Sequence, residues 1–350
     1  MLAALAGPAR ADTVVLNPDH PGRYVVVPGD TLWGIAARFL RNPWKWPDIW
    51  YINPAIENPH LIYPGDVISL VMRNGEPVLM LERAPENARP AFKMSPALNT
   101  EKLSPQVRIE KLERAIPTLP MDAIQQFLLD VYVVGKQEVD HAPYIVAMEE
   151  GHLVAAANDT VYARGMMDKS TARYQAFRTG RVYRDPDTED DEIIGYEALR
   201  VGTARVEAFG DPTTLTFLDS SREVLIGDRL LPFPENSTLD THFIPRAPET
   251  DIHGRIIAMF DAVARVGQFQ VVVLNRGHAD GVRPGHVFAA FRSGDKVRDL
   301  ITARKKGQTV TLPDARSGLI MVFRTFDRVS YGLVTQASRD IRLHDTVGNP

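Results

Sequence analysis

The chain has 350 residues, of which 44% are hydrophobic and 24% charged, a composition typical of folded globular proteins. Its formal net charge of -4 argues against a nucleic-acid binder, which needs a surface that neutralises phosphates. The absence of cysteine excludes disulfides, thiolate metal sites, iron–sulfur clusters and cysteine nucleophiles.

The first residues predict an exported protein. Residues 1–11 are apolar and alanine-rich and end in Ala9-Arg10-Ala11, which places small side chains at both positions that signal peptidase reads. We therefore expect residues 1–20 to contain a signal-peptide remnant and a disordered start. Since no uncharged apolar run reaches the roughly 18 residues that span a bilayer, no transmembrane segment is predicted.

Residues 21–72 begin with a predicted strand and helix. The β-branched run at residues 24–27 favours a strand, and Pro28-Gly29-Asp30 is typical of a turn. Asp30 or Thr31 is a candidate N-cap for a helix near residues 31–40, whose apolar side chains share one face.

A second helix and a second strand complete this region. Asn42-Pro43 ends the first helix, and Pro47 suits the first turn of a helix near residues 47–53. A turn at residues 63–66 then leads into a strand at residues 67–71. The predicted order is strand, helix, helix, strand, a small βααβ domain.

Residues 73–121 change in character. Seven prolines interrupt a polar stretch, which predicts a linker with one short helical piece at residues 107–115.

Residues 122–350 are predicted to be mostly β-structure after an initial helix at residues 121–129. Short runs rich in valine, isoleucine, tyrosine and phenylalanine alternate with turn residues, as in a sandwich or barrel. The predicted strands are residues 144–148, 161–164, 201–209, 214–218, 269–274, 287–291, 319–323 and 330–335. The fold class is therefore α+β, a βααβ domain followed by a β-rich region.

Two further features of the β-rich region concern its organisation. Residues 185–192 contain six acids in eight positions, which we interpret as a solvated loop because calcium-loop spacing is missing. Residues 221–230 resemble residues 338–347, and residues 279–288 are a weaker third variant. We predict two related β subdomains with a boundary near the proline-rich segment 232–248.

The N-terminal motifs resemble a LysM domain. The resemblance rests on residues 24–36, Trp50-Tyr-Ile-Asn-Pro54 and residues 61–68, in matching order and spacing. It implies a βααβ fold that binds N-acetylglucosamine glycans, chiefly peptidoglycan or chitin, in a groove between the first strand-to-helix loop and the loop before the last strand. The site residues carried onto this sequence are Gly29, Asp30, Thr31, Leu32, Ile56, Asn58, Pro59, Leu61 and Ile62.

The composition of residues 22–72 agrees with sugar recognition. Four basic and four acidic side chains balance there, which suits an uncharged ligand that meets backbone groups over an apolar floor. All four tryptophans lie in this region. We expect Trp33 and Trp50 in the core and leave core packing and ligand stacking open for Trp44 and Trp46. For Asp30, helix capping and ligand contact both stay open.

No catalytic, metal or cofactor site is predicted. None of the nine histidines forms the His-x-His or His-Glu-x-x-His pattern of zinc peptidases. Ser293-Gly-Asp-Lys296 matches Ser-x-x-Lys but lacks the partner motifs of that enzyme class. We therefore expect a protein that is not an enzyme.

The C-terminal sequence resembles that of the LysM-containing secretin-associated proteins of type IV pili, the TsaP family. The resemblance rests on residues 195–198, 221–232, 274–282 and 319–334. It implies a FlgT-like β region and a periplasmic protein that binds peptidoglycan glycan chains and an outer-membrane secretin ring. Two alternatives stay open, an anchor for another envelope machine such as a flagellar ring and a LysM-tethered cell-wall hydrolase.

Overall fold

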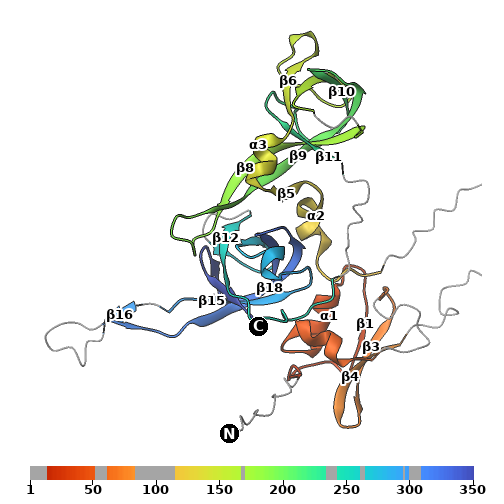
Figure 1. The fold of residues 1–350 in the computed structure, drawn as a ribbon. Helices are drawn as coiled ribbons and strands as arrows, with labels where there is room; N and C mark the ends of the chain where they lie inside the picture. Colours follow the sequence, from red (N-terminus) through yellow and green to blue (C-terminus); the bar gives the residue numbers. More distant parts are fainter. Residues whose placement is uncertain are drawn as a thin grey trace, which may run out of the picture. The chain divides into compact units, whose positions relative to one another are not determined.

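The computed structural model describes residues 14–51, 61–82, 115–166, 170–233, 243–260, 265–294, 296–298 and 309–350. The chain divides into two compact units, residues 1–119 and residues 120–350 (Figure 1). Within the described ranges no helix is both long and apolar enough to cross a membrane. Most of the helix predicted at residues 107–115 lies outside the described residues.

The first unit is a four-stranded sheet with two short helical segments. The strand order is β1-β3-β4-β2, antiparallel except for the β2–β4 pair. Its elements are β1 (Arg23–Val25), α1 (Leu32–Phe39), the 3₁₀ segment η1 (Pro43–Ile49), β2 (Trp50–Tyr51), β3 (Val67–Arg73) and β4 (Glu76–Glu82).

Helix α1 confirms the helix predicted near residues 31–40. The Thr31 hydroxyl caps it by accepting from the Gly34 N–H at 3.0 Å, and Leu32, Ile35 and Phe39 are buried on one face. The helix predicted near residues 47–53 differs in the structure: the 3₁₀ segment η1 spans Pro43–Ile49, and Trp50–Tyr51 form strand β2. Pro47 inside η1 lacks an N–H and cannot join an α-helical ladder.

The first unit extends beyond the predicted boundaries at its N-terminal end. Residues 14–17, expected in a disordered start, pack against α1. The Asn17 N–H donates to the Phe39 carbonyl at 2.8 Å, and Leu16 forms a β-bridge with Leu40. Residues 1–13 lie outside the described part of the chain.

The predicted linker also begins too early. Strand β4 pairs with β3 along its whole length through a turn at Asn74-Gly75, both with positive φ (53° and 87°). Asn-Gly between apolar runs is a strong hairpin signal. Residues 73–82 therefore belong to the sheet.

The second unit contains two six-stranded barrels. In the first, pairing of β10 with β9 closes the order β10-β7-β6-β11-β8-β9, and β5 adds to β9. Its strands are β5 (Val131–Val134), β6 (Tyr144–Met148), β7 (Thr160–Arg164), β8 (Arg173–Arg184), β9 (Ile193–Ala208), β10 (Thr213–Ser220) and β11 (Arg229–Pro232). Its helical segments are α2 (Met121–Leu129), α3 (Lys136–His141) and η3 (Glu149–Gly151).

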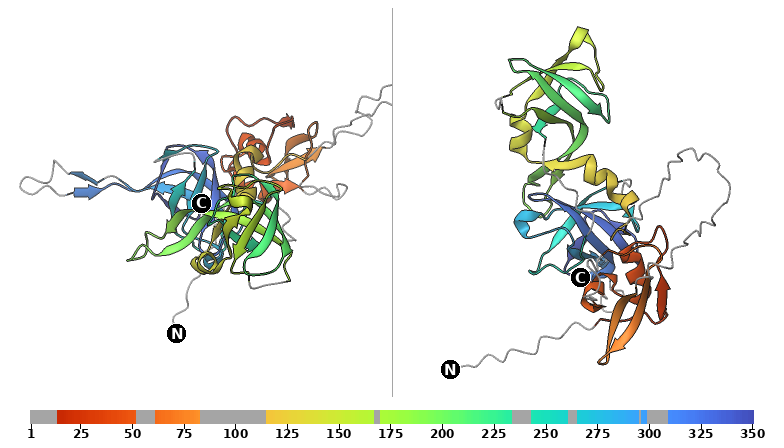
Figure 2. Two further views of the ribbon diagram at one scale, coloured as in Figure 1. Left: turned by 90° about the horizontal axis from the view of Figure 1, so that it is seen from above. Right: turned by 90° about the vertical axis from the view of Figure 1, so that its right-hand side faces the viewer.

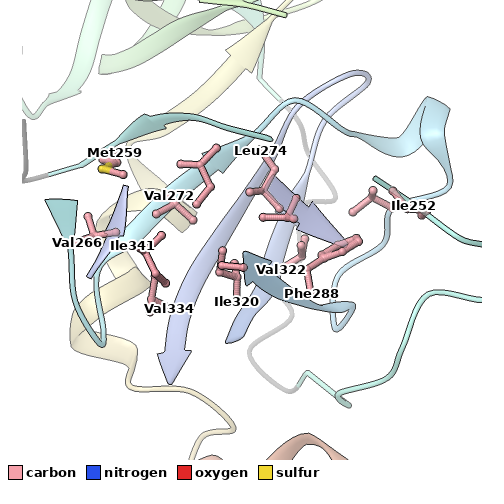
Figure 3. Packing of buried hydrophobic residues seen from close by; sticks show 14 residues of the cluster. Ile252, Met259, Val266, Val272, Leu274, Phe288, Ile320, Val322, Val334 and Ile341 are labelled. Carbon is pink, nitrogen blue, oxygen red and sulfur yellow. The ribbon is translucent and has the colours of Figure 1, made fainter. Parts of the chain in front are cut away.

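The second barrel has the order β12-β14-β19-β18-β15-β21. Its core side chains, among them Val272, Ile320 and Val334, gather between the strands in Figure 3. The barrel strands are β12 (Gly254–Met259), β14 (Val271–Leu274), β15 (Val287–Arg292), β18 (Ala315–Thr325), β19 (Ser330–Ala337) and β21 (Thr346–Gly348). Beside them are η4 (His278–Asp280), the pair β13 (Arg265–Val266) and β20 (Ile341–Arg342), and the pair β16 (Lys296–Arg298) and β17 (Thr309–Thr311), which extends away from the barrel (Figure 2).

The two barrels repeat one topology. Around the first barrel the strands follow the order β6-β7-β10-β9-β8-β11, and around the second the order β12-β14-β19-β18-β15-β21. Strands at the same place in the two orders also come in the same order along the chain, so each has corresponding neighbours. Ser221 and Ser338 each donate a backbone N–H at 2.8 Å to a neighbouring strand, and Asp228 and Asp345 each accept an N–H from three residues earlier at 2.8 Å. The sequence repeat at residues 221–230 and 338–347 thus has a structural counterpart.

The acidic segment at residues 185–192 is not simply a solvated loop. Asp185 is only 4% exposed, and the Asn275 side-chain amide donates to Asp185 at 2.5 Å and to Asp187 at 2.9 Å. The guanidinium groups of Arg255 and Arg276 pair with Asp187 at 2.5 and 3.2 Å. The interpretation as a solvated loop was wrong for these acids. Their arginine partners belong to the second barrel and are far from residues 185–192 in the sequence.

Further polar contacts fasten the two barrels together. The hydroxyl groups of Tyr183 and Tyr331 lie 3.3 Å apart in a buried position. The Arg324 guanidinium donates to the carbonyls of Phe127 and Val131 at 2.6 and 2.8 Å, which ties the end of α2 and the start of β5 to β18. Because buried donors and acceptors are costly to separate, these contacts stabilise the packing of the two barrels against each other.

The charge on Asp187 makes this junction sensitive to acid. Burial raises the pKa of Asp187, but hydrogen bonds from Asn275 and Arg255 and the nearby arginine charges outweigh it, so the pKa lies below its ordinary value of 3.8. A depressed pKa stabilises the fold above pH 3.8, and this contribution disappears as the pH falls through the folded-state pKa.

We predict that Asp187→Asn lowers the free energy of unfolding by roughly 1 kcal/mol near pH 6 and by less near pH 3. Urea unfolding followed by circular dichroism at both pH values measures the difference. Asp190→Asn, in the exposed part of the same segment, is the matched control. An effect of Asp187→Asn that is equal at both pH values would contradict the account.

Candidate functional site

The loop between β1 and α1 is shaped by Asp30. One oxygen of its carboxylate accepts from the Val27 N–H and from the Tyr24 hydroxyl, each at 2.9 Å. Gly29, at the tip, has a φ of 93°, which glycine adopts at no steric cost. Asp30 therefore closes the turn, and Thr31 alone is the helix cap.

The loop before β3 repeats this turn. The Asp66 carboxylate accepts from the Tyr63 N–H at 3.0 Å, and Gly65 has a φ of 94°. Two backbone hydrogen bonds join the loops: the Gly65 N–H donates to the Val26 carbonyl at 2.8 Å, and the Val26 N–H donates to the Asp66 carbonyl at 2.9 Å. The structure thus brings the two loops together.

Among the predicted site residues, Leu32 and Ile62 are buried, at 5% and 0% exposure, and belong to the core cluster of the first unit. Their side chains lie in the interior of the first unit, whereas Gly29 is exposed at the loop tip. Asp30, Thr31 and Leu61 are partly exposed. Ile56, Asn58 and Pro59 lie outside the described residues.

A short segment at residues 115–119, which we name the strap, lies between these two loops. The Ile116 N–H donates to the Ile62 carbonyl at 2.8 Å, while the N–H groups of Leu32 and Trp33 donate to the carbonyls of Pro117 and Thr118 at 3.0 and 3.2 Å. The Ile116 side chain is 3% exposed and packs in the same core cluster. These residues were predicted as linker, so the strap is a correction to that prediction.

Sequence reasoning missed the strap because its neighbours resemble a linker. Pro117 and Pro120 break any periodic pattern, and the isolated apolar residues Ile116 and Leu119 are too few to indicate a helix or a strand. The available signal was the pair of apolar residues Ile116 and Leu119 at the end of a proline-rich stretch.

The tryptophans divide between core and surface. Trp33 and Trp46 are each 3% exposed, and the Trp46 and Trp50 rings pack edge to face with centroids 5.4 Å apart. Trp44 and Trp50 are partly exposed, and the Lys45 ammonium lies 5.3 Å from the Trp44 ring centroid. Core packing therefore accounts for Trp33 and Trp46, while Trp50 is less buried than expected.

The electrostatics of the site are mild. Burial, the hydrogen bond to Asp30 and the charge of that carboxylate raise the pKa of Tyr24, against the opposing charge of Arg38. The Arg38 guanidinium lies 4.6 Å from the centroid of the Tyr24 ring. Across the described residues, no group of three or more histidine, aspartate or glutamate side chains has the arrangement of a metal site. Backbone amides and carbonyls of the two loops lie over buried apolar side chains and bond to one another and to the strap. Such uncharged groups suit a neutral polar ligand.

Comparison with known proteins agrees with this geometry for part of the chain. Residues 24–71 match the LysM domain, a match that runs from β1 into β3. A LysM domain indicates binding to peptidoglycan and a location outside the cytoplasm. Among curated proteins, none matches this chain.

We predict that Asp30→Ala lowers the free energy of unfolding of the first unit by about 1 kcal/mol, because two donors lose their acceptor. All four tryptophans lie at positions 33–50, so their fluorescence during urea unfolding reports this unit. Asp48→Ala, at an exposed position in η1, is the control. Equal unfolding midpoints for the Asp30→Ala variant and the unchanged protein would contradict a role for Asp30 in shaping the loop.

Proposed function

We propose that this protein is a periplasmic, non-enzymatic adaptor that anchors the outer-membrane secretin of a type IV pilus machine to peptidoglycan. The LysM domain binds glycan chains, and the second unit binds the secretin ring. One observation supports glycan binding most directly. In the region that matches LysM, two Pro-Gly-Asp turns contact each other beside the buried side chains of Leu32 and Ile62.

The chemistry of these loops supports a glycan as the ligand. The donors and acceptors that they offer are backbone amides and carbonyls, and the charges of residues 22–72 balance. An N-acetylated sugar presents hydroxyl groups, an acetamide and apolar ring faces, which these groups can meet without a compensating charge. A polyanion would be expected to need a basic surface instead.

The second unit supports an adaptor rather than an enzyme. Burial raises the pKa values of Tyr183 and Tyr331 well above the ordinary range, and their hydroxyl groups meet each other in the junction between the barrels. Their shifted pKa values have a structural cause. The acids of residues 185–192 with well-defined partners, such as Asp185, are likewise engaged in the junction. A stiff body of two joined barrels suits the transmission of force.

The secretin as partner rests on the resemblance of the C-terminal sequence to the TsaP family. Pulling a pilus through the outer membrane loads the secretin, and peptidoglycan is the stiff layer beside it. Many copies around a ring would multiply the modest affinity of single LysM domains. A flagellar ring is the alternative partner, and a LysM-tethered cell-wall hydrolase is the alternative class.

We predict that the full chain co-sediments with purified peptidoglycan and that Gly29→Asn weakens this binding several-fold, because a side chain then projects from the loop tip. Gly75→Asn is the matched control. Both glycines have positive φ, and a Cβ at either position meets no atom within 4 Å, but Gly75 lies in the β3–β4 turn.

Salt dependence distinguishes the classes of ligand in the same assay. For a neutral glycan, binding should change little with ionic strength, whereas a polyanion gives a steep fall. Equal binding by the Gly29→Asn and Gly75→Asn variants would count against the loop assignment. Release of soluble muropeptides by the protein would favour the hydrolase alternative.

We predict a division of labour between the two units. A fragment of residues 120–350 should fold alone, because it is a compact unit with its own barrel cores. Its far-ultraviolet circular dichroism should show a cooperative unfolding transition. It should lose peptidoglycan binding and keep association with the secretin in a pull-down. Sedimentation of this fragment with peptidoglycan as strongly as the full chain would contradict the adaptor model, and capture of a flagellar ring protein instead would favour the alternative machine.

A further inference from the structure

The strap at residues 115–119 uses the backbone groups that the two loops offer. The N–H groups of Leu32 and Trp33 are the first two of α1, which have no partner within the helix. They donate to the carbonyls of Pro117 and Thr118. On the other loop, the Ile62 carbonyl accepts from the Ile116 N–H at 2.8 Å. Two donors and one acceptor are thus taken by peptide groups.

These peptide groups have the same hydrogen-bonding chemistry as the acetamido group of an N-acetylated sugar. An acetamido group has one N–H, one carbonyl and a methyl group, and is itself a peptide unit. The strap presents carbonyl oxygens to Leu32 and Trp33, an N–H to Ile62 and an aliphatic side chain to the core. A glycan that uses the same three backbone groups must compete with the strap, because each N–H donates well to one acceptor at a time.

We propose that the strap is an autoinhibitory segment, so that glycan binds at these loops only when the strap leaves. This inference rests on the proposed glycan-binding function of the LysM domain. The domain alternates between a closed state with the strap in place and an open state that binds glycan. The apparent affinity of the full chain is then the intrinsic affinity reduced by the fraction of open molecules.

Along the chain, the strap immediately precedes the second unit, since Leu119 is the last residue of the first unit and Pro120 is the first residue of the second.

The side chain of Ile116 allows a direct test with the full chain. Ile116→Ala removes buried contacts that only the closed state makes and should raise the open fraction. We expect the affinity for a chitin tetramer, measured by calorimetry, to increase by about ten-fold.

Two variants serve as controls. Ile116→Val keeps most of the buried volume and should bind nearly as the unchanged protein does. Leu79→Ala truncates a side chain of the same core cluster that is 1% exposed but lies in β4. It loosens the domain without removing a strap side chain and should not increase the affinity.

A second measurement needs no substitution. Hydrogen exchange of the Ile116 amide reports the closed state, because its N–H is bonded to the Ile62 carbonyl. Adding the chitin tetramer to the unchanged full chain should accelerate exchange at Ile116. This holds even if Ile116→Ala fails to fold.

The outcomes separate this inference from the proposed function. Tighter binding by Ile116→Ala, or faster exchange at Ile116 on adding the tetramer, supports the inference. The inference is overturned if the tetramer binds the unchanged protein and Ile116→Ala with equal affinity and the exchange rate at Ile116 does not change. Glycan recognition then stands. Absence of binding by both folded proteins overturns glycan recognition and the inference with it.

Discussion

The N–H groups that begin helix α1 are the constraint on which the first unit depends. A helix leaves its first N–H groups without internal partners, and here Thr31 satisfies one while Pro117 and Thr118 satisfy two others. Residues far along the chain are thereby held against the two loops that carry the LysM match. The same groups that complete the fold are those that we propose a glycan uses, so in this proposal stability and recognition compete for one set of hydrogen bonds.

The second unit solves a different physical problem. Two barrels of the same topology are joined by polar contacts, in which the buried side chains of Asn275 and Asp185 meet the more exposed Asp187. Arg324 adds a further tie by donating to carbonyls at the end of α2 and the start of β5. Such a junction is costly to open because each separated donor or acceptor loses its partner.

Local patterns predicted much of this fold, and non-local contacts account for what they missed. The helix at residues 121–129 is α2, and the strand at residues 144–148 is β6, because apolar periodicity and turn residues determine such elements locally. The acidic segment at residues 185–192 was misread because its arginine partners lie in another barrel. The strap was missed because the burial of Ile116 depends on loops more than fifty residues earlier. In the site, the turn residues Gly29 and Asp30 could be recognised from the sequence. The strap carbonyls that accept from the first N–H groups of α1 could not.

Glycan recognition by backbone groups at the start of α1 is the central claim, and amide chemical shifts test it most directly. The measurement is a titration of the isotopically labelled full chain with a chitin tetramer, followed by nuclear magnetic resonance. The account predicts the largest shift changes at the amides of Leu32, Trp33 and Ile116, which lie on both sides of the strap contact. Shift changes confined to the second unit or to the β3–β4 turn at Gly75 would contradict it.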